Sequence, residues 1–289
     1  MAEVATFATS DQLLVVIDPV ARRTDGESVR IAKDVLSAGA ATKVCMPEGP
    51  EEFARVLARR GSRRPVLVGD DRALMRTVSL LHRQRELAGC ALSMVPVGGA
   101  LSLAGALGVP TGAVAAARAV LDGVVRRMDL LVDDSDGVVL GALRIPSLPS
   151  PAVPSPAGSG HASWLRTCQS LVRTLVPARP ARERESLDGV PRFAPARLRV
   201  EVDGVTLVDL DQPVEAVSVR PGASGLAEVE VRPVSVGAEA SPLCARGRSV
   251  TVSGADFRYR ADAVVAGPVR TRTWVVREGA WGLTLPGSS

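Results

Sequence analysis

Aromatic residues are scarce in this chain of 289 residues, making up 3% of it against a hydrophobic fraction of 46%. The core must therefore be built mainly from Val, Leu and Ala. The cysteines are scattered and lack the spacing of metal ligands; they are Cys45, Cys90, Cys168 and Cys244. This cysteine usage predicts a reduced, cytoplasmic protein, and no metal site is expected.

Long apolar runs and a dense basic stripe are missing as well, and no signal peptide is expected from the opening residues. No apolar run reaches the roughly 18–20 residues that span a bilayer, and the opening MAEVATFATSDQ does not have the pattern of a signal peptide. Lysine occurs only as Lys33 and Lys43, so the net charge of +4 comes from arginine. Without a dense basic stripe interleaved with aromatics, nucleic acid is not an expected partner. The mild basic excess permits attraction to an anionic membrane face, and peripheral membrane contact stays open.

Strands and helices alternate over residues 12–125, after an N-terminus (1–11) that we expect to be disordered. Short connections between such elements predict a doubly wound parallel sheet, an α/β domain that binds ligands at the carboxyl ends of its strands. Those ends are Asp18-Pro19, Gly69-Asp70-Asp71 and residues 96–99. The predicted strands are 13–17, 42–46, 65–69 and 91–95.

Residues 126–286 have the period-two pattern of β-strands and predict an antiparallel sandwich or barrel, whose last strand could return to the first domain. Asp203-Gly204 predicts the turn of a hairpin. Two stretches rich in proline cannot pack a core: a mobile insert at 146–162 and a linker at 177–196. Between them, 163–176 predicts an amphipathic helix that either packs on the sandwich or rests on a membrane.

Three stretches at the strand ends carry a resemblance to a known family. Asp18-Pro19 follows the first strand, GDDRAL spans 69–74, and PVGGALSLAGALGVP spans 96–110. They resemble the Asn-Pro, Gly-Gly-Asp-Gly-Thr-Leu and Pro-x-Gly-Thr-x-Asn-Asp-x-Ala-Arg-x-Leu-Gly-x-Pro signatures of the diacylglycerol kinase family. This family includes bacterial lipid kinases and sphingosine kinase and is related to NAD kinases. Positions that match the third signature are Pro96, Gly98, Ala104, Leu107, Gly108 and Pro110.

The resemblance covers roughly 12–143 and 198–286 and implies a fold, an activity and a site. The implied fold is an NAD kinase-like α/β domain followed by a β-sandwich, and the implied activity is ATP-dependent phosphoryl transfer to a lipid hydroxyl with Mg²⁺. YRADAVVAG resembles the family's Asp-Gly-Glu stretch, which makes Asp262 the candidate catalytic base. The implied nucleotide site consists of Asp18, Gly69, Asp71, Arg72, Gly98 and Gly99.

Several departures from the family pattern fall on the positions that carry its chemistry. Asp70 and Arg72 replace glycines whose bare backbone would approach phosphate oxygens, and Ala73 replaces the threonine. Val264 replaces the glutamate of the acidic pair, and losing a general base typically costs roughly 10²–10⁴-fold in rate. We therefore expect a catalytically impaired protein that acts as a ligand-binding or regulatory protein. The alternatives are an active diacylglycerol or sphingoid kinase with a rebuilt loop, and an interaction scaffold that binds no nucleotide.

Each site residue also has a purely structural interpretation. Asp71 could cap a helix that begins at Arg72, and Arg72 could be a solvated arginine. Gly98 and Gly99 could form a tight turn instead of an anion site, and Asp262 could be a surface acid on a strand. A further acidic group reads as a turn between strands with some cation affinity; it is Asp133, Asp134 and Asp136. Edge strands leave a homodimer open.

Overall fold

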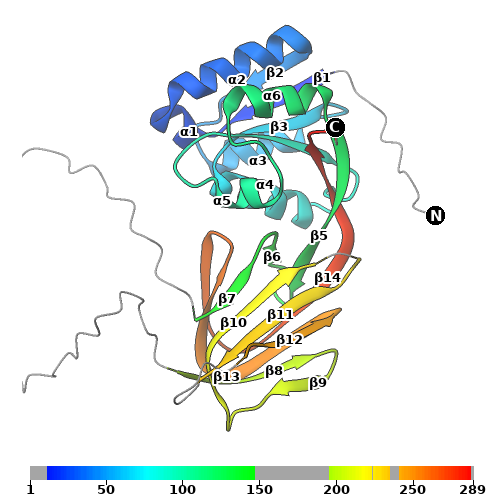
Figure 1. Cartoon of the computed structure of the whole chain (residues 1–289). Helices are drawn as coiled ribbons and strands as arrows, with labels where there is room; N and C mark the ends of the chain where they lie inside the picture. Colours follow the sequence, from blue (N-terminus) through cyan, green and yellow to red (C-terminus); the bar gives the residue numbers. More distant parts are fainter. Residues whose placement is uncertain (1–11, 147–194, 223, 235–240, 288–289) are drawn as a thin grey trace, which may run out of the picture. The chain divides into compact units, whose positions relative to one another are not determined.

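The computed structural model describes residues 12–146, 195–222, 224–234 and 241–287 (Figure 1). The expected disordered N-terminus and the amphipathic helix at 163–176 lie outside the described residues. The insert at 146–162 and the linker at 177–196 lie outside them almost entirely. The described residues belong to one compact unit. None of their helices is both long and apolar enough to cross a bilayer.

Four parallel strands form the first part of the sheet, in the order β4-β3-β1-β2. They are β1 (Gln12–Ile17), β2 (Ala41–Cys45), β3 (Arg64–Gly69) and β4 (Ala91–Pro96). β1 and β3 are buried along nearly their whole length, as expected of strands covered on both faces. All four strands coincide closely with the stretches that the apolar pattern of the sequence predicts.

Helices cover both faces of these four strands, and alternate residues of β1 therefore belong to two different cores. Leu13 and Val15 pack with α1 (Pro19–Thr24), α2 (Gly26–Gly39) and α6 (Ala113–Asp122). On the other face, Leu14 and Val16 pack with α3 (Pro50–Ala58), α4 (Asp71–Arg83) and α5 (Ser102–Ala106). This arrangement brings the starts of α1, α4 and α5 to the carboxyl ends of the strands (Figure 1).

The rest of the described chain is β-rich, with only antiparallel pairings among its own strands. The β8–β9 hairpin turns at Asp203 and Gly204, whose φ angles of 49° and 80° are both positive. This confirms the predicted turn, since a tight hairpin of this kind requires positive φ at both central residues. The strands are β5 (Val124–Asp133), β6 (Val138–Val139), β7 (Leu143–Ile145), β8 (Ala196–Val202), β9 (Val205–Val208), β10 (Pro213–Pro221), β11 (Ala227–Pro233), β12 (Leu243–Gly247), β13 (Ser249–Ala261) and β14 (Val264–Leu285).

The long strand β14 joins the two kinds of structure. Its first half pairs with β13, its second half pairs with β5, and near its end it lies parallel to β4 through Gly282 and Leu283. All strands of the described chain therefore belong to one hydrogen-bonded network of 14 strands. The fold is mixed α/β with a large β-rich part, and its last strand returns to the parallel strands, an option that the sequence analysis left open.

Candidate functional site

Three strand ends meet at the carboxyl edge of the parallel strands. Gly69 ends β3, and a Cβ on it would lie 3.2 Å from the Cβ of Asp18, which follows β1. Gly98 follows β4 with a φ of +129°, and a Cβ on it would lie 3.2 Å from the Cβ of Asp70. Four residues that the sequence placed at strand ends are thus neighbours in space, and both glycines are needed for the close approach.

Asp18 is a buried carboxylate, 1% exposed, with two partners. One oxygen accepts a hydrogen bond of 2.8 Å from the Val20 N–H and caps α1. The other oxygen forms an ion pair with Arg76 from the second turn of α4. The Arg76 guanidinium also lies 5.2 Å from the ring centroid of Phe53 on α3. Sequence reasoning missed Arg76, because nothing local marks an arginine 58 residues away as the partner of Asp18.

Asp70, not Asp71, caps helix α4. Its side chain accepts a hydrogen bond of 2.9 Å from the Ala73 N–H, and the helix begins at Asp71. The interpretation of Asp71 as the cap of a helix beginning at Arg72 was therefore wrong by one residue. The physical reason is that both aspartates suit a cap, while extended backbone, which a cap needs, occurs at Asp70.

Asp71 instead binds the start of a different helix. It is 3% exposed, and its two oxygens accept hydrogen bonds of 2.9 Å from the Leu103 N–H and 3.0 Å from the Ala104 N–H. The Ser102 hydroxyl donates a third, at 3.3 Å. Leu101, the residue before α5, provides no side-chain cap of its own. Asp71 therefore satisfies the free amides of α5 from across the sheet edge.

Side-chain carboxylates thus accept hydrogen bonds from backbone amides that could otherwise donate to a ligand. The N-terminal amides of a helix attract anions because they lack intrahelical partners. At α4 and α5 these groups already have Asp70 and Asp71 as acceptors. Arg72 and Gly99 are exposed, and a Cβ on Gly99 would meet nothing within 4 Å. They are the predicted site residues that remain open to a ligand.

Asp262 lies in the turn between β13 and β14 and not on a strand, with a φ of +49°. Its carboxylate accepts hydrogen bonds of 2.7, 2.8 and 2.8 Å from the N–H groups of Leu140, Gly141 and Ala142. Burial raises the pKa of Asp262, against the opposing effect of these three amides. The interpretation as a surface acid on a strand is therefore wrong, since the side chain holds the segment before β7. Val264, where the family has its glutamate, is 52% exposed.

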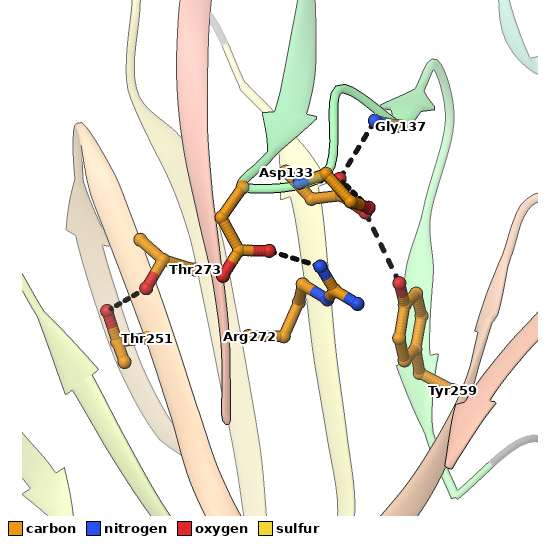
Figure 2. A network of polar contacts seen from close by, with 8 residues as sticks. Asp133, Gly137, Thr251, Tyr259, Arg272 and Thr273 are labelled. Atoms are coloured by element: carbon orange, nitrogen blue, oxygen red, sulfur yellow. Dashed lines mark hydrogen bonds and ion pairs between the residues drawn. The ribbon is translucent and has the colours of Figure 1, made fainter. Parts of the chain in front are cut away.

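The acidic group at the end of β5 forms the predicted turn, in which the Asp136 N–H donates to the Asp133 carbonyl; Figure 2 shows Asp133 with Gly137 and Tyr259. Asp133 accepts hydrogen bonds of 2.8 Å from both the Ser135 and the Gly137 N–H, and the Tyr259 hydroxyl donates to it at 3.3 Å. Asp134 forms an ion pair with Arg272. Burial alone would raise the pKa of Asp133, but hydrogen bonds from the Ser135 hydroxyl and from the Gly137 and Ser135 N–H groups, together with the Arg272 charge, hold it below its ordinary value. In the described part of the chain, no three His, Cys, Asp or Glu side chains are grouped so as to hold a metal ion.

Comparison by sequence finds no family model and no curated protein that matches this chain. Comparison by structure finds close matches. A candidate diacylglycerol kinase from Bacillus anthracis str. Sterne matches with a TM-score of 0.68 at 12% identity, over 95% of this chain and 97% of that chain. A diacylglycerol kinase structure from the same organism matches with a TM-score of 0.65 at 11% identity over the same shares. The resemblance suggested by the motifs is thereby confirmed for the fold: the chain is built like these diacylglycerol kinases.

Proposed function

We propose that this chain has the fold of a lipid kinase but is impaired in phosphoryl transfer and acts as a ligand-binding or regulatory protein. The observation that carries this proposal is the use of Asp70, which stands where the family signature has a glycine, as the internal cap of α4. Phosphoryl transfer depends on positioning and on electrostatic stabilisation of the phosphate oxygens. A phosphate seated here would meet the carboxylate that already holds one of the amides it needs.

The described residues do not fit a triphosphate with Mg²⁺ at the family's nucleotide position. Asp18 and Asp70 would place two carboxylates beside the phosphates where the family signatures have asparagine and glycine, and like charges at close range repel. Freeing the α5 amides would break buried hydrogen bonds of Asp71, and a buried group left without partners costs about 1–3 kcal/mol. Arg72 could offset part of this repulsion, which keeps weak nucleotide binding within the proposal.

The candidate base is also engaged elsewhere. A general base needs an oxygen within hydrogen-bond reach of the hydroxyl that it deprotonates. Asp262 uses both oxygens on the amides of residues 140–142, and the second acid of the pair is replaced by Val264. With one acid engaged and the other absent, activation of a lipid hydroxyl has little support. The ligand that we expect is a lipid or a nucleotide, bound in the cytoplasm or at a membrane surface.

Two measurements on the full chain test this function. The first is the shift in melting temperature with Mg-ATP, and the second is transfer of labelled phosphate from ATP to diacylglycerol or to a sphingoid base. An active diacylglycerol kinase assayed in parallel supplies the reference rate. Binding without transfer supports our proposal. Transfer at the reference rate contradicts it and favours an active kinase with a rebuilt loop, while neither binding nor transfer favours an interaction scaffold.

A further inference from the structure

Strand β2 forms an edge of the sheet, at the far end of the parallel strands from β4. It pairs with β1 from Ala41 to Cys45, and among the described residues no strand pairs with its other side. An edge strand offers unpaired N–H and C=O groups that can accept a further strand. β2 is also less buried than β1 or β3, with only half-buried and exposed residues.

A small pocket of about 220 Å³ lies beside this edge, between β2 and helix α3. Leu14 and Val56 provide its apolar lining, while Lys43, Arg55 and Arg59 line it with positive charge. Lys43 pairs with Leu14 in the register, so it faces the same side of the sheet as Leu14, the side that α3 covers. The apolar lining, the cations and the free edge therefore lie together.

The charges of this pocket are not balanced. None of Lys43, Arg55 and Arg59 has a carboxylate partner within the described part of the chain, although other exposed arginines such as Arg30 do. The acid of the lining, Glu52, accepts a hydrogen bond of 2.8 Å from the Glu48 N–H instead. Three cations against one engaged carboxylate favour a ligand with negative charge.

The size of the pocket indicates what kind of ligand this is. Small-molecule sites usually enclose about 300–1,000 Å³, which is more than this pocket offers. A volume of about 220 Å³ suits one or two side chains of a peptide. Peptides that extend a sheet gain affinity from main-chain hydrogen bonds and specificity from pockets for alternate side chains. We propose that β2 and this pocket bind an extended acidic segment of a partner protein as an added strand.

A second copy of the chain is a weaker occupant. Joining two β2 edges would bring the cations of both copies together, and like charges across an interface cost binding energy. An anionic lipid surface would satisfy the cations but not the strand edge. A second copy would show as dimerisation and a lipid surface as binding to phosphatidylserine vesicles, so the experiment distinguishes both of them from a peptide.

The test uses the full chain and a fluorescein-labelled heptapeptide of alternating Glu and Val, followed by fluorescence polarisation. We expect saturable binding that weakens by about tenfold or more in an Arg55→Glu/Arg59→Glu variant, because two attractive charges become repulsive. The matched control is Arg83→Glu/Arg118→Glu, which makes the same change of net charge at exposed helical positions on α4 and α6. Arg83 lies in the last turn of α4, as Arg55 does in α3, so the control also carries the helix-dipole cost of one charge reversal near a helix C-terminus.

A peptide with N-methyl groups at alternate residues tests the added strand itself. It retains the charges but loses hydrogen-bond donors, so we expect it to bind about tenfold more weakly or not at all. The proposal is overturned if the heptapeptide shows no saturable binding, if the methylated peptide binds equally well, or if the control variant loses as much affinity as the test variant. It is equally overturned if Arg55→Glu/Arg59→Glu abolishes dimerisation, or binding to phosphatidylserine vesicles, while leaving peptide affinity unchanged.

Discussion

Single carboxylates organise the carboxyl edge of the parallel strands. Asp18, Asp70 and Asp71 each accept hydrogen bonds from the start of a helix, and each does so for a different helix. Helix starts need such acceptors, because their first amides have none within the helix. In a phosphate-binding loop a ligand can accept these hydrogen bonds; in this protein side-chain carboxylates accept them.

Loss of Asp71 should cost more stability than loss of Asp70. In Asp71→Asn, one amide oxygen can still accept a hydrogen bond, but the NH₂ group then faces donors of α5. We expect the free energy of unfolding to fall by about 1–3 kcal/mol, as for buried groups left unsatisfied. Urea unfolding followed by circular dichroism measures this. Asp70→Gly is the matched comparison and should cost only a few tenths of a kcal/mol, since glycine is tolerated as a cap. Equal losses in both variants would contradict our account of Asp71.

Asp133 should contribute to acid sensitivity. Its pKa lies below its ordinary value of 3.8 despite burial, because Ser135 and Gly137 donate hydrogen bonds to it and Arg272 adds positive charge. A lowered pKa in the folded state means that the stabilisation is present above pH 3.8 and is lost as the pH falls through the folded pKa. Unfolding measured at a series of acidic pH values should therefore show a shallower loss of stability in Asp133→Asn than in the unaltered chain. A profile that is unchanged in slope would count against this role.

Local sequence signals predicted several elements well. The four parallel strands and the β8–β9 hairpin depend on apolar runs and on turn residues next to each other in the chain, and these elements were found as expected. The start of α4 was misplaced by one residue, because Asp70 and Asp71 are equally good caps by composition. The extended backbone lies at Asp70, and Asp71 instead contacts α5, more than 30 residues further along the chain.

The turn from β3 into α4 allows a direct test of the lost nucleotide chemistry. Combining Asp70→Gly, Arg72→Gly and Val264→Glu removes one carboxylate, restores two glycines and returns the second acid. We expect tighter Mg-ATP binding, since bare backbone can approach phosphate oxygens more closely. The measurement is a calorimetric titration with Mg-ATP, with Val264→Glu alone as the control because it leaves the turn unaltered. Identical affinities in the triple variant and the unaltered chain would show that these positions do not limit nucleotide binding.

Strand β14 makes the two kinds of structure depend on each other. Trp274 on this strand is fully buried in the core of the β-rich part, whereas Trp281, further along it, is fully buried in a core that includes α3, α4 and α5. The C-terminal strand is therefore part of the α/β core as well, through its parallel pairing with β4. A domain boundary drawn near residue 125 separates a stretch of alternating strands and helices from a stretch of β-strands, but it does not separate two independent cores.

Removing Trp281 should consequently affect the whole described unit. Trp281→Ala deletes a large side chain from the α/β core, and such changes cost about 3–5 kcal/mol. We expect both the helical signal and the near-ultraviolet signal of the remaining tryptophans to be lost together in urea, in one transition at lower denaturant. Separate transitions for the two signals would contradict the coupling through β14. Trp274→Ala, which empties the other core, should give the same single transition.

The amino-acid sequence by itself determined the strands, the tight hairpin, the order of the α/β and β-rich parts and the motif spacing that pointed to a diacylglycerol kinase fold. All of these arise from residues close together in the chain, whose backbone preferences and apolar periodicity act locally. Tertiary structure alone decided that Arg76 neutralises Asp18, that Asp71 caps α5 and that Asp262 holds residues 140–142. Each of these depends on which distant backbone amide or side chain folding brings within hydrogen-bond reach, and local preference carries no information about that.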